Sequence, residues 1–99
     1  MLKRISVLLL FTAMSVVLLS AYTTKKKTRI LIFSKTTGYR HASIPIGKKA
    51  LMELGASQDF LVDTTEDASV FNAKNLKQYD VILFLSTTGN VLDSAQQQA

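Results

Sequence analysis

Apolar residues along this chain come in short runs that alternate with more polar segments. The runs at residues 29–34 and 81–85 are apolar at nearly every position, which is typical of strands buried on both faces, as in a parallel sheet. A shorter run at residues 60–64 predicts a strand between them. The alternation of strand and helix-compatible segments predicts an α/β fold.

The segment between the first two strands predicts a helix over residues 44–54. Ser43 is suited to the N-cap, Pro45 to the first turn, and Gly55 to the position after the last turn. We expect its buried stripe, which recurs at helical spacing, to consist of Ile46, Gly47, Ala50, Leu51 and Leu54.

Two shorter helical segments follow. Residues 70–78 predict one or two turns, and Asp93 with Gln96 matches a capping box at a helix start. That last helix has only begun at Ala99, and a three-stranded parallel sheet needs cover on both faces and both edges. We therefore expect residues 29–99 to be the N-terminal part of a longer domain, here truncated.

Residues 1–21 are set apart by a basic start and an apolar run. Lys3 and Arg4 precede residues 5–19, an apolar length that suits a signal-peptide core better than a membrane span of about 20 residues. The favoured interpretation is cleaved export to the periplasm or the extracellular space. An uncleaved anchor helix through residues 5–22 and a cytoplasmic protein are the alternatives.

Positive charge is concentrated outside the predicted sheet. The chain has a formal net charge of +5, and Lys25–Lys27 lies in a basic linker at residues 22–28. A nucleic-acid interface needs basic and aromatic side chains spread over one face, so no nucleic-acid partner is predicted. Contact with a membrane is expected only through the N-terminal segment, and the oligomeric state stays open. The chain has no Cys, which excludes a disulfide or a Cys nucleophile within it.

Polar loops follow all three predicted strands. Parallel strands end at one edge of the sheet, where open α/β proteins bind their ligands. The loops at that edge are residues 35–43, 65–67 and 86–90. This arrangement predicts a polar pocket.

The first loop contains the only His of the chain, next to an Arg. His41 would be a catalytic proton-transfer group or a polar ligand contact, or would only hydrogen-bond a neighbouring carbonyl. Arg40 would orient or neutralise a ligand oxygen, or would only pair with Glu66 or Asp67. A lone His without ligand spacing is not a metal motif, so no metal site is predicted, and the cofactor is left open.

The third loop offers hydroxyls and backbone N–H groups from Thr87, Thr88 and Asn90, which would line the pocket or cap the following helix. Gly38 and Gly89 suit tight turns. Neither glycine lies in a dinucleotide-binding or P-loop pattern, so nucleotide binding has little support.

The order and spacing of these motifs resemble the trehalose-utilisation (ThuA-like) family from about residue 29 to the end. The resemblance rests on residues 33–41 (FSKTTGYRH), 43–45, 65–67, 79–81, 87–89 and 96–97. It implies a flavodoxin-like three-layer sandwich with a parallel sheet, related to class I glutamine amidotransferases. It also implies a role in carbohydrate metabolism, and export is common among bacterial members.

The family's Gly-[Phe/Tyr]-Arg-His motif maps onto Gly38–His41, and its Thr-Thr-Gly turn maps onto Thr87–Gly89. The resemblance thus implies a carbohydrate or other small-molecule ligand. The expected ligand-binding residues are Tyr39, Arg40, Ser43, Thr87, Thr88 and Gly89. The family's next strand, with its Gly-x-His turn, lies beyond residue 99. A non-catalytic carbohydrate-binding module and an inactive truncated product are the alternatives.

Overall fold

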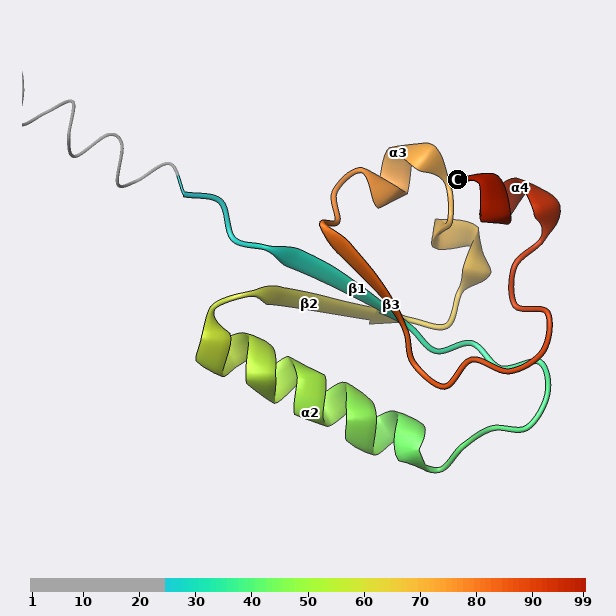
Figure 1. The fold of residues 1–99 in the computed structure, drawn as a ribbon, viewed down its shortest axis with the longest axis horizontal. Helices are drawn as coiled ribbons and strands as arrows, with labels where there is room; N and C mark the ends of the chain where they lie inside the picture. Colours follow the sequence, from blue (N-terminus) through green and yellow to red (C-terminus); the bar gives the residue numbers. More distant parts are fainter. Residues whose placement is uncertain (1–24) are drawn as a thin grey trace, which may run out of the picture.

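A computed structural model describes residues 25–99 of the chain, so the expected signal peptide or anchor of residues 1–21 lies outside the described residues. Lys25–Thr28 forms neither helix nor strand. The elements that follow, in chain order (Figure 1), are β1 (Arg29–Phe33), α2 (Ser43–Gln58), β2 (Leu61–Thr65), the 3-10 helix η1 (Ala68–Val70), α3 (Ala73–Leu76), β3 (Val81–Phe84) and α4 (Ser94–Gln98).

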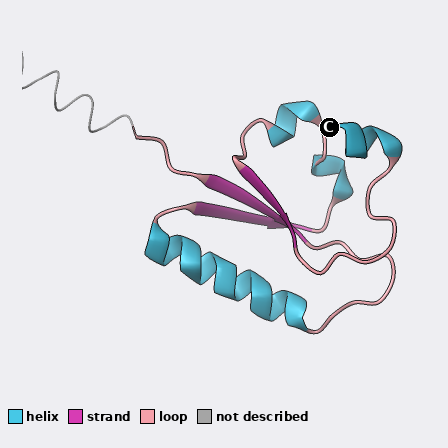
Figure 2. Ribbon diagram, in the orientation of Figure 1, coloured by secondary structure: helices cyan, strands magenta, loops and turns pink. Residues whose placement is uncertain are grey.

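The three strands form one parallel sheet in the order β2–β1–β3 (Figure 2). All three predicted strands are confirmed, to within a residue or two at their ends. The central position of β1 explains its continuous apolar run, because both faces of the strand are covered. Leu31, Ile32 and Phe33 are only 2%, 1% and 0% exposed. Because the strands are parallel, their carboxyl ends meet at one edge, as predicted.

Helices cover both faces of the sheet, with α2 along one face and η1, α3 and α4 on the other (Figure 1). The core on the second face is built around Phe33 and Phe71, whose ring centroids lie 4.7 Å apart in an edge-to-face arrangement. Phe84 meets Phe33 edge-on at 5.6 Å. The aromatic contacts therefore join β1, β3 and the turn after η1.

Helix α2 is longer than predicted, and only part of its predicted stripe faces the sheet. Ile44 is fully buried and Gly55 is buried, whereas Ile46 is 72% exposed and Leu54 is 47% exposed. The prediction for Ile46, Ala50 and Leu54 was wrong. Gly47 and Leu51 of the predicted stripe are half-buried, because they share a face with Ile44 and Gly55. The helix starts at Ser43, and Ala42 rather than Ser43 takes the N-cap position.

Gly55 does not end α2, as the sequence suggested, but lets the helix approach β2. A Cβ at Gly55 would lie 2.9 Å from both the Phe60 carbonyl oxygen and Val62 Cγ2. The helix ends instead at Asp59, which adopts the left-handed conformation with φ 61° and donates its N–H to the Gly55 carbonyl.

Polar contacts join the amino ends of the strands on the η1 side. The Arg29 guanidinium lies 3.1 Å from a carboxylate oxygen of Asp63, and the Tyr79 hydroxyl donates to the same oxygen at 2.7 Å. The backbone N–H of Arg29 donates to the Asp80 carboxylate at 2.8 Å. Partial burial and the Asp63 carboxylate raise the pKa of Tyr79, which keeps its hydroxyl a donor.

Helices within residues 25–99 do not combine the length and the apolar character that crossing a bilayer requires.

Substitution of Gly55 tests the close approach of α2 to β2. Gly55→Ala should lower the free energy of unfolding by about 1–3 kcal/mol, because the new methyl group would overlap backbone that cannot move away. Gly47→Ala is the matched control, since its Cβ would meet only the flexible Leu85 side chain at 3.2 Å. Urea unfolding measures both. Equal effects of the two substitutions would contradict this packing.

Candidate functional site

The loops after β1 and β3 are hydrogen-bonded to each other. The Thr37 N–H donates to the Thr88 carbonyl at 2.9 Å, and the Thr88 hydroxyl donates to the Tyr39 carbonyl at 2.7 Å. Gly89 has a φ of 76°, and a Cβ there would collide with the Thr37 hydroxyl, so this position requires glycine. We call Thr37, Tyr39, Thr88 and Gly89 the loop clasp.

The turn that leads β3 into the clasp has an uncommon backbone. Ser86 adopts the left-handed region with φ 50°, which costs a non-glycine residue about 1 kcal/mol or more. At the end of β1, Ser34 is fully buried, and its hydroxyl has no hydrogen-bond partner within residues 25–99. Both residues lie at the carboxyl edge, where the polar pocket was predicted.

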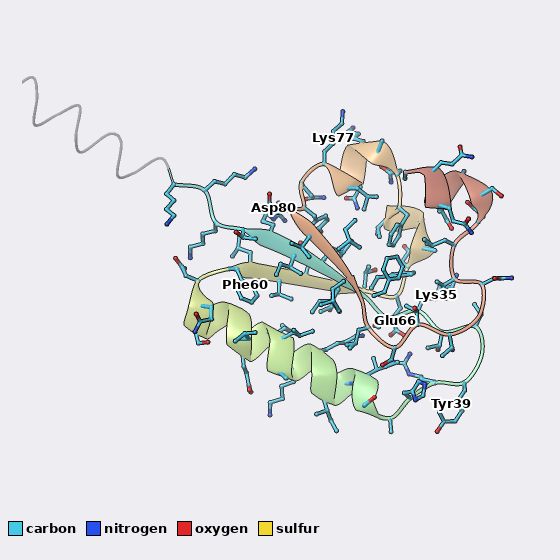
Figure 3. All side chains as sticks on the ribbon, viewed as in Figure 1. Lys35, Tyr39, Phe60, Glu66, Lys77 and Asp80 are labelled. Carbon is cyan, nitrogen blue, oxygen red and sulfur yellow. The ribbon has the colours of Figure 1, made fainter. Side chains whose placement is uncertain are left out.

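Two aromatic side chains project from the clasped loop. Tyr39 is 73% exposed and extends away from the body of the protein (Figure 3). Its ring centroid lies 5.0 Å from that of His41, with the rings nearly perpendicular. We call Tyr39 and His41 the aromatic pair. A fixed backbone therefore presents two exposed rings to solvent.

A charged cluster lies beside the aromatic pair. Arg40 forms a two-contact ion pair with Glu66, and the Lys48 ammonium lies 3.6 Å from the same carboxylate. The hydrogen bond from Arg40, helped by Lys48, holds the pKa of Glu66 below its usual range. Glu66 is thus ionised at neutral pH and acts as a hydrogen-bond acceptor.

Of the two carboxylates considered for Arg40, the structure pairs it with Glu66. Asp67 instead accepts the Ser69 N–H at 2.9 Å as the N-cap of η1, which lowers the pKa of Asp67. The sequence interpretation gave Glu66 no partner beyond Arg40 and did not include Lys48. No local signal indicated this contact, because it depends on how α2 approaches the loop after β2.

The predicted ligand-binding residues fall into separate groups. Tyr39, Thr88 and Gly89 meet in the loop clasp, where the Thr88 hydroxyl is engaged in holding the loop. Thr87 is half-buried beside them. Ser43 is exposed at the start of α2, and its side chain makes no hydrogen bond within the described part of the chain.

Two open pockets lie at opposite edges of the sheet. The one at the carboxyl edge has a volume of about 410 Å³ and is lined by Lys35, Ala68, Asn90, Val91, Leu92, Asp93 and Gln96. The other, of about 390 Å³, lies between the basic linker and the end of α2, where Lys27 pairs with Asp59 at 2.8 Å. The first pocket lies at the same edge as the candidate residues, but none of the predicted ligand-binding residues lines it. Across residues 25–99, no three His, Cys, Asp or Glu side chains are grouped as a metal site requires.

The trehalose utilisation family (ThuA) matches residues 29–99, which is most of the chain. The chain belongs to this family, as the sequence motifs indicated. No curated protein and no solved structure matches it.

The acid dependence of stability tests the charged cluster. A carboxyl group with a lowered native-state pKa stabilises the fold above its unfolded-state pKa, and this contribution is lost as pH falls through the native value. Below roughly pH 5, the free energy of unfolding of the wild type should therefore decrease more than that of Glu66→Gln. The extra decrease should be at most about 1 kcal/mol, because the ion pair is exposed. Urea unfolding across this pH range measures the difference.

Glu53→Gln is the control for this experiment, because Glu53 has one partner, Lys49, at 3.9 Å on the outer side of α2. Its profile should follow that of the wild type. If Glu66→Gln also followed the wild type, the cluster would not form in solution.

Removal of one hydroxyl tests the loop clasp. Thr88→Val deletes the donor to the Tyr39 carbonyl and should cost about 1 kcal/mol of local stability. The Thr37 amide, which donates to Thr88, should then exchange its hydrogen several-fold faster, as measured by NMR. Thr87→Val is the matched control, and equal exchange rates in the two variants would be inconsistent with the clasp.

Proposed function

We propose that this member of the trehalose utilisation family binds a carbohydrate at the carboxyl edge of its sheet and acts in carbohydrate metabolism. The observation that carries the proposal is the aromatic pair, two exposed rings on a loop held by the clasp. Rings presented in this way pack against the apolar face of a sugar, while nearby polar groups bond its hydroxyls. The Arg40–Glu66 pair supplies both donors and acceptors for such hydroxyls.

Each predicted residue has a role in this proposal. His41 contacts the ligand or transfers a proton, since imidazole changes its charge near neutral pH. Arg40 orients or neutralises a ligand oxygen. The other positions proposed to contact the ligand are Ser43, Thr87, Thr88 and Gly89.

A second candidate function, a non-catalytic carbohydrate-binding module, is favoured by the state of Glu66. Two cations hold this carboxylate ionised, so it is an acceptor for sugar hydroxyls and not a proton donor at neutral pH. Binding without turnover would follow from that arrangement.

The fold and the location are part of the same proposal. The strand order β2–β1–β3 supports a flavodoxin-like sheet, which has its ligand crevice between β1 and β3. The basic start and the apolar run within residues 1–21 support export to the periplasm or the extracellular space. An anchor through residues 5–22 is the alternative, and no nucleic-acid partner is proposed.

Calorimetric titration of the chain with trehalose and with glucose tests carbohydrate binding. Tyr39→Ala should weaken binding about tenfold, and Tyr39→Phe should retain it because the ring is kept. Ile46→Ala, which removes an equally exposed side chain from α2, is the control. Thermal unfolding of each variant verifies that it is folded.

His41→Ala separates the two candidate functions. Loss of sugar turnover with an unchanged fold supports proton transfer by His41. Sugar binding by the wild type without any turnover supports the binding module. Wild-type affinity and turnover in both Tyr39→Ala and His41→Ala would refute the proposed site.

A further inference from the structure

Strand β3 lies at an edge of the sheet, and its outer side has no neighbouring strand within residues 25–99. The Leu85 N–H donates to the Phe33 carbonyl at 2.9 Å, so alternate residues of β3 direct their backbone groups toward β1. The backbone N–H and C=O groups of Ile82 and Phe84 therefore point outward, away from β1. Unpaired groups of this kind are a template for the addition of another strand.

The side chains of β3 do not oppose such pairing. All residues from Val81 to Leu85 are apolar, and none of them is charged or a proline. Val81 is 45% exposed, and Phe84 is 48% exposed although it meets Phe33 edge-on in the core. Edge strands are usually protected by a charge, a proline or a covering element. β3 lacks the first two, and these exposures show that its cover is incomplete.

The other edge strand, β2, carries the protection that β3 lacks. Asp63 lies at its centre, in contact with Arg29 and Tyr79. Glu66 and Asp67 follow the strand directly. An antiparallel pair of β2 strands centred on Asp63 would bring two carboxylates opposite each other, and like charges at such positions are destabilising. Among the three described strands, the unprotected edge is thus that of β3.

We propose that β3 pairs with β3 of a second copy of this chain, in an antiparallel arrangement with a two-fold axis at Leu83. In this register Ile82 lies opposite Phe84 of the partner subunit, and the two residues exchange both backbone hydrogen bonds. The two-fold axis repeats this pair on its other side. The outward backbone groups of Ile82 and Phe84 are thereby satisfied in both copies.

The same register is complementary in its side chains, which favours a second copy over an unrelated strand. Residues opposite each other in an antiparallel pair project from the same face of the sheet. Ile82 and Phe84 share the face that η1 covers, and they meet there as an apolar pair. On the α2 face, Leu83 meets its own copy, and Val81 meets Leu85. Every side-chain contact is apolar, and no like charges meet.

This pairing goes beyond the proposed function and does not depend on it. The combined sheet has the three strands of each copy, in the order β2–β1–β3–β3–β1–β2. Because the two β3 strands are antiparallel, the carboxyl edges of the two copies face in opposite directions. Both candidate sites therefore stay open in the dimer.

Sedimentation equilibrium of the full chain over a range of concentrations tests the dimer. The wild type should show a monomer–dimer equilibrium, and Val81→Lys should weaken it about tenfold, because each ammonium would lie opposite an apolar side chain of the partner. Leu61→Lys is the matched control, since Leu61 is the first residue of the other edge strand and is 47% exposed. It should associate as the wild type does. Thermal unfolding verifies that both variants are folded.

Cysteine cross-linking tests the register and does not depend on the lysine variant. The chain has no Cys, so Leu83→Cys introduces the only thiol. At the two-fold axis the two Cα atoms would be about 4.5 Å apart, which a disulfide can span. Oxidation with copper–phenanthroline should therefore link Leu83→Cys into a covalent dimer. Thr64→Cys is the control, because Thr64 and Leu83 both pair with Ile32 from opposite edges of the sheet.

Three results would each overturn the proposal. The first is a wild type that is monomeric at every concentration, including one in which the β3 edge is covered within a single chain. The second is association that Val81→Lys and Leu61→Lys leave equal, which would place the contact on another surface. The third is equal cross-linking of Leu83→Cys and Thr64→Cys.

Discussion

Burial of β1 between two parallel neighbours is the constraint on which the rest of the structure depends. Leu31, Ile32 and Phe33 are almost fully removed from water, and each such side chain contributes about 1.5–3 kcal/mol of hydrophobic stabilisation. Both edges of the strand are paired with a neighbouring strand, and helices cover both of its faces. Once β1 is central, the loops after all three strands must leave at the same edge, and the candidate site follows from that placement.

The loop clasp extends the pairing of β1 and β3 beyond the ends of the two strands. The isolated bridge between Thr36 and Thr88 continues the parallel pairing of β1 and β3 after both strands have ended. Tyr39 and His41 are exposed, so packing does not position them. The Tyr39 carbonyl accepts the Thr88 hydroxyl of the opposite loop, and the His41 carbonyl accepts the Ile44 N–H at the start of α2. Exposure and fixed placement are compatible here because the restraint acts on the main chain.

Features with a local physical cause were predictable from the sequence. The strands follow from their apolar runs, and the capping box of Asp93 and Gln96 needs only residues three apart, so both were confirmed. The buried face of α2 was predicted only in part, because apolar residues lie on more than one side of the helix and the contact with β2 at Gly55 determines which side is buried. Local spacing contains no information about that contact.

The candidate site also combines features that the sequence predicts with features that depend on tertiary contacts. Its edge of the sheet follows from strand direction, which the sequence predicted, and the alternative partner Glu66 was considered for Arg40. The contribution of Lys48 and the clasp between the Thr37 and Thr88 loops depend on how distant segments approach, which no residue pattern encodes. The pocket that contains Lys35 belongs to this second class, since its wall combines the loops after β1 and β3 with η1 and the start of α4.

Gly89 is the point of closest approach between the loops after β1 and β3. A Cβ on Gly89 would collide with the Thr37 hydroxyl and would lie 3.3 Å from the Gly38 backbone nitrogen. Tyr39 follows Gly38, and Asn90 follows Gly89, so the contact lies next to one residue of the aromatic pair and one residue that lines the pocket at the carboxyl edge. A side chain at position 89 would therefore break the clasp. Glycine at this position is required both by its φ of 76° and by the contact with the opposite loop, and the placement of Tyr39 depends on that contact.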